Sequence, residues 1–103
     1  MKKITNDFQV FMEESHGVGQ ALMKVITTSS EGSALDSKTQ ELAYISVLAA
    51  LQLSAGLPFH VAHAKELGAS LEEVKSAVLV GLPLVGIRIT EAFAKAIESY
   101  EEI

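Results

Sequence analysis

Apolar residues recur at helical spacing along the whole chain, and no stretch sustains the alternation of apolar and polar positions that is typical of a strand. Two amphipathic stripes come first. The first consists of Ile4, Phe8, Phe11 and Met12, and the second of Val18, Ala21, Leu22, Val25 and Ile26. They predict two helices that meet near His16 and Gly17, followed by a polar loop over residues 29–33.

The clearest helix start lies after this loop. Asp36 is a capping carboxylate with the apolar Leu35 before it. The helix is predicted to run to about Leu53, and after Glu41 it is apolar on nearly every side. We therefore expect it to lie at the centre of the fold.

Turn and cap residues divide the rest of the chain. Pro58 suits the first turn of the next helix, and Gly68 suits its C-terminal cap. Ser70 and Glu73 have the spacing of a capping box for a helix that runs from residue 71 to about residue 82.

The sequence Gly81-Leu82-Pro83 and then Gly86 interrupt that helix before a last amphipathic stripe. This stripe consists of Ile89, Phe93, Ala96, Ile97 and Tyr100. The whole pattern predicts an all-α fold of about six helices in a single domain, residues 1–103.

Composition excludes several classes of function. The chain has 103 residues, a net charge of −5 and scattered Lys and Arg, which argues against a nucleic-acid partner. It has no cysteine, so disulfides, thiolate metal sites and thiol redox chemistry are excluded. The basic start is followed by acidic residues and not by a signal-peptide core, and we expect a cytoplasmic protein.

The apolar content is high for a short chain. Hydrophobic residues make up 49% of it and the mean hydropathy is +0.30, whereas a domain of this size buries only about 60–65% of its unfolded surface. The uncharged segment Leu42–Ala64 is long enough for a membrane span. However, Gly56 and Pro58 would break a helix in mid-bilayer. We therefore expect a homo-oligomer and no membrane association.

Four titratable residues lie in apolar surroundings: Glu41, His60, His63 and Arg88. Glu41 is either an ordinary carboxylate near a helix start or a proton relay beside an imidazole. His60 and His63 are three residues apart and share a helix face. They are open to a structural role, to acid–base or ligand contact, and to metal binding. A metal site needs a third ligand, and no metal motif is present, so we predict none.

Arg88 suits either a substrate carboxylate or a carboxylate across a subunit interface. Tyr44 and Tyr100 carry no further functional signal in the sequence.

Three segments carry a family resemblance: "ALDSKTQEL", "FHVAHAKELGASLEEV" and "VLVGLPLVGIRITEAFAKA". Over residues 34–100 the chain resembles the carboxymuconolactone decarboxylase and alkylhydroperoxidase D superfamily. The most specific pieces are Leu-Asp-x-Lys-Thr-x-Glu-Leu and the spacing His-x3-Ala-x3-Gly-Ala, which starts at His60. The resemblance implies an all-helical AhpD-like domain that assembles as trimers or hexamers.

The peroxidase branch of that superfamily has a Glu twelve residues before a Cys-x2-Cys-x3-His motif. Glu41 and His60 match its Glu and His, but Leu53 and Gly56 stand at the cysteine positions. Peroxide reduction there needs an attacking thiolate and a resolving thiol. Peroxidase-type antioxidant activity is therefore the less favoured alternative for this chain.

The decarboxylase branch has no cysteine pair and keeps a histidine at the position of His60. It implies acid–base chemistry, decarboxylation or isomerisation, on a small carboxylated metabolite without a cofactor. His60 and Glu41 would be catalytic, and His63 and Arg88 would bind the substrate. This chain has Gly-Ile-Arg-Ile from Gly86 where the decarboxylases tend to have Gly-Phe-Pro-Ala. The alternative is a catalytically silent ligand-binding or scaffold oligomer of the same fold.

Overall fold

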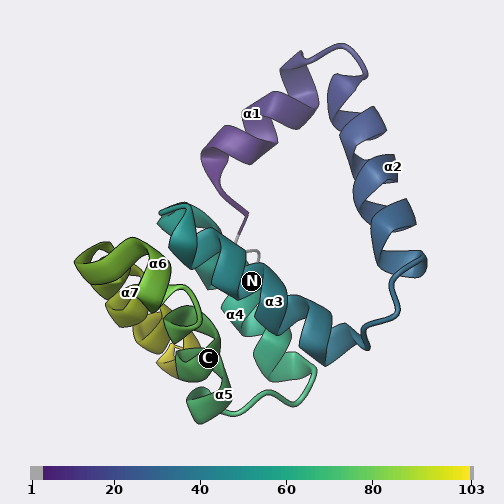
Figure 1. Ribbon diagram of the computed structural model, residues 1–103. Helices are drawn as coiled ribbons and strands as arrows, with labels where there is room; N and C mark the ends of the chain where they lie inside the picture. Colours follow the sequence, from purple (N-terminus) through teal and green to yellow (C-terminus); the bar gives the residue numbers. More distant parts are fainter. Residues whose placement is uncertain (1–3, 103) are drawn as a thin grey trace. The chain divides into compact units, whose positions relative to one another are not determined.

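The computed structural model describes residues 4–102, and all the regular structure in that range is helical, which confirms the all-α prediction (Figure 1). The chain divides into two compact units, an N-terminal unit of residues 1–36 and a C-terminal unit of residues 37–103. Each unit is described by itself below. That residues 1–103 act as a single domain stays a prediction.

The N-terminal unit is a pair of helices, α1 (Asn6–Glu14) and α2 (Val18–Glu31). The Thr5 hydroxyl caps α1 by accepting the Phe8 N–H at 3.2 Å. The two helices pack closely at Gly19, where an added Cβ would lie 3.0 Å from the Met12 Cα. Only a glycine permits that approach without a shift of the backbone.

The second helix is longer than predicted. It continues to Glu31, so residues 29–31 are helical and the predicted loop begins only after them. Ser29 and Ser30 extend a helix at modest cost. Gly32 then ends it, with its N–H bonded to the Thr28 carbonyl at 3.0 Å.

The C-terminal unit is a bundle of four longer helices joined by short ones. The longer helices are α3 (Ser37–Ala50), α4 (Leu57–Glu66), α5 (Leu71–Leu79) and α7 (Ile89–Glu101). Helix α3 packs against α4 and α5, and α7 packs against the same two, so the four form a ring around one core (Figure 1). The short helices are η1 (Ser54–Gly56), α6 (Leu82–Val85) and η2 (Gly86–Arg88).

Helix α3 supplies much of that core, as predicted, through Ile45, Leu48 and Ala49. It ends at Ala50 and not near Leu53. Gln52 adopts a left-handed φ of 60°, which the helix cannot continue through, and the turn closes with the Leu53 N–H on the Leu48 carbonyl at 2.9 Å. The extra turn η1 then leads directly into α4.

Two predicted cap signals are confirmed. Gly68 takes a φ of 96° after α4, and the Ala69 N–H reaches back to the Ala64 carbonyl at 2.9 Å. Ser70 and Glu73 form the capping box of α5, with reciprocal bonds of 2.9 and 3.0 Å.

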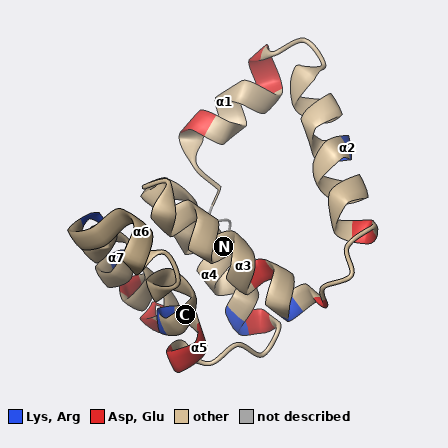
Figure 2. Cartoon of the chain, viewed as in Figure 1, with Lys and Arg blue, Asp and Glu red and all other residues tan. Residues whose placement is uncertain are grey.

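Charge is distributed unevenly along the C-terminal unit, as Figure 2 shows by colour. The N-terminal parts of α3 and of α5 carry both acidic and basic residues, whereas α6 carries no charged residue. By length and composition alone, the stretch Leu71–Glu101 is apolar enough to cross a membrane. It is not one straight helix, because the chain turns at Gly81 and Gly86 and brings α5 against α7.

Candidate functional site

Three of the four predicted site residues meet between α3 and α4. The Glu41 carboxylate accepts a hydrogen bond on each oxygen: His60 Nδ1 contacts Oε1, and His63 Nδ1 contacts Oε2 at 3.0 Å. We call Glu41, His60 and His63 the carboxylate–imidazole cluster. The interpretation of Glu41 as a neighbour of an imidazole agrees with this geometry.

The helical repeat explains why these residues converge. Glu41 precedes Ile45 and Leu48 by four and seven residues, so it lies on the buried face of α3. On α4, His60 and His63 lie three residues apart, beside the buried Val61 and Ala64. Packing α3 on α4 therefore brings one carboxylate against two imidazoles.

Burial is graded across the cluster. The side chain of Glu41 is 11% exposed, that of His60 is 20% exposed and that of His63 is 45% exposed. A carboxylate so deeply placed needs hydrogen-bond donors, and the two imidazoles supply them. Glu41 is thus the most buried residue of the cluster, and His63 is the residue most exposed to solvent.

Aromatic rings complete the surroundings of His60. Tyr44 stacks on it with centroids 4.2 Å apart and planes 18° apart, and Phe59 meets it edge-on at 5.0 Å. The sequence analysis gave Tyr44 no functional signal. Tyr44 follows Glu41 by three residues and therefore lies on the same side of α3. This spacing is the feature of the sequence that could have indicated its contact with the site.

Hydrogen-bond roles in the cluster follow from the carboxylate. An ionised carboxylate only accepts, so each Nδ1 that contacts Glu41 carries a proton. In the neutral imidazole the Nε2 atom is then unprotonated and carries a lone pair. His60 therefore presents a basic nitrogen on the side of its ring away from Glu41.

Arg88, the fourth predicted site residue, lies elsewhere. Its Nε and Nη2 both donate to the Gln52 side-chain oxygen, at 3.1 and 2.5 Å. This contact fastens η2 to the turn after α3. Among the contacts of the described residues, none joins Arg88 to the carboxylate–imidazole cluster.

One of the two positions at which the peroxidase branch has a cysteine lies close to this cluster. Leu53 comes just before η1 and Gly56 ends it. A Cβ atom at position 56 would lie 3.9 Å from His60 Cδ2. The backbone thus keeps the approach of position 56 to the histidine, while the chain offers no thiol there.

In the described part of the chain no group of three or more His, Asp or Glu residues is arranged to hold a metal ion. Within residues 4–102, every buried side-chain nitrogen or oxygen has a hydrogen-bond partner.

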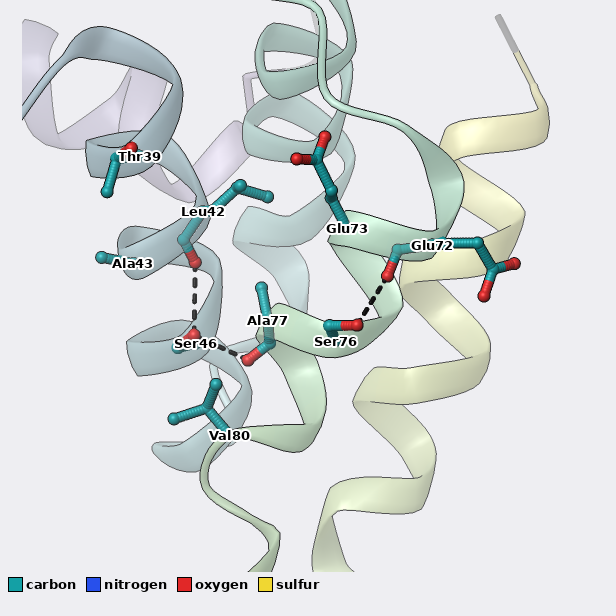
Figure 3. Close-up of a pocket in the computed structure, with 9 residues that line it drawn as sticks. All are labelled: Thr39, Leu42, Ala43, Ser46, Glu72, Glu73, Ser76, Ala77 and Val80. Atoms are coloured by element: carbon teal, nitrogen blue, oxygen red, sulfur yellow. Dashed lines mark hydrogen bonds between the residues drawn. The ribbon is translucent and has the colours of Figure 1, made fainter.

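A groove of about 610 Å³ opens between α3 and α5, and its lining does not include the cluster (Figure 3). Ser46 crosses it by donating to the Ala77 carbonyl at 2.6 Å, and Ser76 donates to the Glu72 carbonyl at 2.8 Å. Glu73 is held by the Ser70 N–H and by Lys38, which keep the pKa of its carboxyl below the usual value. These polar groups cap helices or form hydrogen bonds within and between them. We therefore place the candidate site at the carboxylate–imidazole cluster.

A protein-family model matches this chain. The model of the carboxymuconolactone decarboxylase family matches residues 17–98, which is most of the chain. Searches of curated proteins and of solved structures gave no match. The family match spans α2 and nearly all of the C-terminal unit, including every residue of the cluster. The chain therefore belongs to the carboxymuconolactone decarboxylase family.

Proposed function

We propose that this protein catalyses proton transfer on a small carboxylated metabolite, in a decarboxylation or an isomerisation, with His60 as the general acid or base. One observation carries the proposal. The nearly buried Glu41 accepts both imidazole Nδ1–H groups, and this leaves the His60 Nε2 lone pair directed away from the carboxylate.

The chemistry follows from this arrangement. In an isomerisation His60 Nε2 takes a proton from one carbon of the substrate and returns it to another; in a decarboxylation it first takes a proton from solvent and gives it to the carbanion that remains after carbon dioxide leaves. While His60 carries that proton, its positive charge lies against the Glu41 carboxylate. Glu41 thereby orients the ring and stabilises the imidazolium.

Substrate carboxylate binding falls to His63 or Arg88 in this proposal. His63 is the most exposed residue of the cluster, and with a proton on Nε2 as well as on Nδ1 its ring donates to a carboxylate there. The Arg88 guanidinium uses two of its nitrogens on Gln52 and keeps further N–H groups for an anion. Replacing Arg88 by Lys removes the planar fork, so a role in binding predicts a raised KM with little change in kcat.

The active form is proposed to be a homo-oligomer, a trimer or a hexamer. Large apolar side chains of the C-terminal unit are strongly exposed, among them Val80 at 68%, Leu84 at 89% and Ile87 at 81%. Exposed apolar surface on this scale favours a partner subunit. Analytical ultracentrifugation tests the assembly, and a monomer at every concentration would contradict it.

The direct test is steady-state kinetics of the wild type, His60→Ala and Glu41→Gln on a panel of lactones and β-keto acids. Turnover by the wild type and a loss of about 10²–10⁴-fold in both variants is the expected result. His16→Asn is the matched control, because His16 lies in the turn between α1 and α2 and Asn tolerates its φ of 53°. Equal rates in wild type and both variants would rule the mechanism out.

A second candidate is a catalytically silent ligand-binding or scaffold protein. It is supported by the complete pairing of Glu41, whose two oxygens are both occupied by histidines. In that case His60 stabilises the fold, and His60→Ala leaves a nearly buried carboxylate short of one donor. A thermal melt of His60→Ala that matches the wild type would count against this candidate.

A further inference from the structure

We infer that His63 is a positioning residue, whose Nδ1–H fixes the Glu41 carboxylate so that His60 keeps the tautomer with an unprotonated Nε2. The inference deepens the proposed function, on which its catalytic meaning rests. Its structural content concerns hydrogen positions in the cluster and is testable without any substrate.

The first step is the orientation of the carboxylate. The last torsion of a Glu side chain is soft and broad, so burial alone does not fix the plane of its two oxygens. In this structure Oε1 contacts His60 and Oε2 contacts His63 at 3.0 Å. Because the two oxygens are bound by different rings, the carboxylate cannot turn without losing one of these hydrogen bonds.

The second step concerns the different surroundings of the two imidazole rings. His60 is 20% exposed, with Tyr44 stacked on one face and Phe59 against its edge. His63 is 45% exposed, and its ring contact within residues 4–102 is a tilted one with Phe59 at 6.2 Å. The His60 ring therefore lies in the more enclosed surroundings, whereas the His63 side chain is held chiefly by its hydrogen bond to Glu41.

The third step links orientation to reactivity. A neutral imidazole has one N–H, and the carboxylate behind His60 draws that proton to Nδ1. If the carboxylate turned away, the proton would redistribute between the two nitrogens. The fraction with a proton on Nε2 can no longer accept one from a substrate, and a carboxylate that holds the tautomer prevents this.

Two substitutions separate the donor from the ring. His63→Asn keeps an N–H near the position of Nδ1, because the Asn amide nitrogen is as far along the side chain as that atom. His63→Phe keeps a ring of similar size and removes the donor. The exposure of His63 makes both replacements compatible with folding, and circular dichroism checks the helical content.

The experiment is ¹⁵N NMR of the histidine ring nitrogens in the full-length wild type and in both variants at neutral pH. Wild type and His63→Asn are expected to show His60 protonated at Nδ1. In His63→Phe the fraction of His60 that carries its proton on Nε2 is expected to rise. His16, the histidine of the N-terminal unit, is the internal reference and should show the same spectrum in all three proteins.

Persistence of the Nδ1–H tautomer of His60 in His63→Phe would overturn the inference. If His63→Phe does not fold, His63→Ala takes its place with the same expectation and the same contrary result. Kinetics add a second readout: kcat falls about tenfold in His63→Phe, and His63→Asn recovers most of the loss.

The two proposals fail separately. If no substrate on the panel is turned over, the proposed function fails while the NMR result still decides the role of His63. If turnover depends on His60 but the tautomer of His60 is the same in the wild type and in the His63 variants, the inference alone fails.

Discussion

Two glutamates of the C-terminal unit, Glu41 and Glu73, each accept several hydrogen bonds, yet they differ in the chemistry of their partners. Glu73 is bound by the Ser70 backbone N–H and by Lys38 at 3.0 Å. Glu41 is bound by two imidazoles. The Glu73 side chain is 42% exposed, whereas the Glu41 side chain is 11% exposed.

The comparison shows what separates a structural carboxylate from a candidate catalytic one. A backbone N–H and a Lys ammonium only donate hydrogen bonds, so they hold Glu73 as the acceptor of a helix cap. An imidazole has two ring nitrogens and can donate a hydrogen bond on one while it accepts a proton on the other. Glu41, placed in the core against two such rings, is able to support proton transfer.

The largest difference is expected in catalysis. Glu41→Gln replaces an acceptor-only carboxylate by a neutral amide and should lower kcat/KM by about 10²–10⁴-fold. Glu73→Gln is the matched control and should leave kcat/KM within about twofold of wild type, because it lies outside the cluster. Steady-state kinetics on the best substrate of the panel measures both. Equal losses in the two variants would erase the distinction.

The free energy of unfolding should distinguish the carboxylate–imidazole cluster from the Ser70–Glu73 capping box less strongly than catalysis does. Glu41→Ala leaves two N–H groups without their acceptor and is expected to cost about 1–3 kcal/mol. Ser70→Ala removes only the hydroxyl half of the Ser70–Glu73 capping box and is expected to cost about 1 kcal/mol. Urea unfolding at pH 7 compares them. A loss in Glu41→Ala well below that in Ser70→Ala would show that the cluster adds little to the fold.

The stacking of Tyr44 on His60 should contribute less again. Tyr44→Leu keeps an apolar side chain and loses the ring contact, with an expected cost of about 0.5 kcal/mol. Tyr44→Phe keeps the ring and should match the wild type. A double-mutant cycle with His60→Ala isolates the pair, and a coupling energy of zero would contradict a direct interaction.

The smallest effect concerns pH and Glu73. Its hydrogen bonds to Ser70 and Lys38 lower the pKa of Glu73 in the folded state, so ionised Glu73 favours folding. This contribution is complete above the ordinary pKa of the group and is lost as the pH falls through that value to the lowered one. The difference in unfolding free energy between wild type and Glu73→Gln should therefore shrink from pH 7 to pH 3. A difference that is constant with pH would contradict the assignment.

Local signals in the sequence predicted much of the fold. The glycine at position 68 and the capping box at Ser70 depend on residues within one turn, and both are confirmed. The end of α3 was predicted three residues too late, because nothing in the apolar run around Gln52 announces a left-handed backbone. Propensity describes a residue's preference, whereas packing selected the turn.

The site was predictable only in part, for a similar reason. The helical repeat predicted that His60 and His63 share a face, but not which residues of α3 that face would meet. The contact of Tyr44 with His60 depends on the rotation of α3 about its axis, which tertiary packing sets. Likewise, the contact of Arg88 with Gln52 joins the short helix η2 to a turn 36 residues away in the sequence.

A crystal structure of the assembled protein tests the central claim most directly, because it shows the carboxylate–imidazole cluster with every subunit in place. The account predicts that Glu41 still bridges His60 and His63 and that the His60 Nε2 opens into an enclosed space with a path to solvent. A His60 Nε2 packed against neighbouring side chains with no space before it, or a Glu41 paired with other residues, would contradict the account.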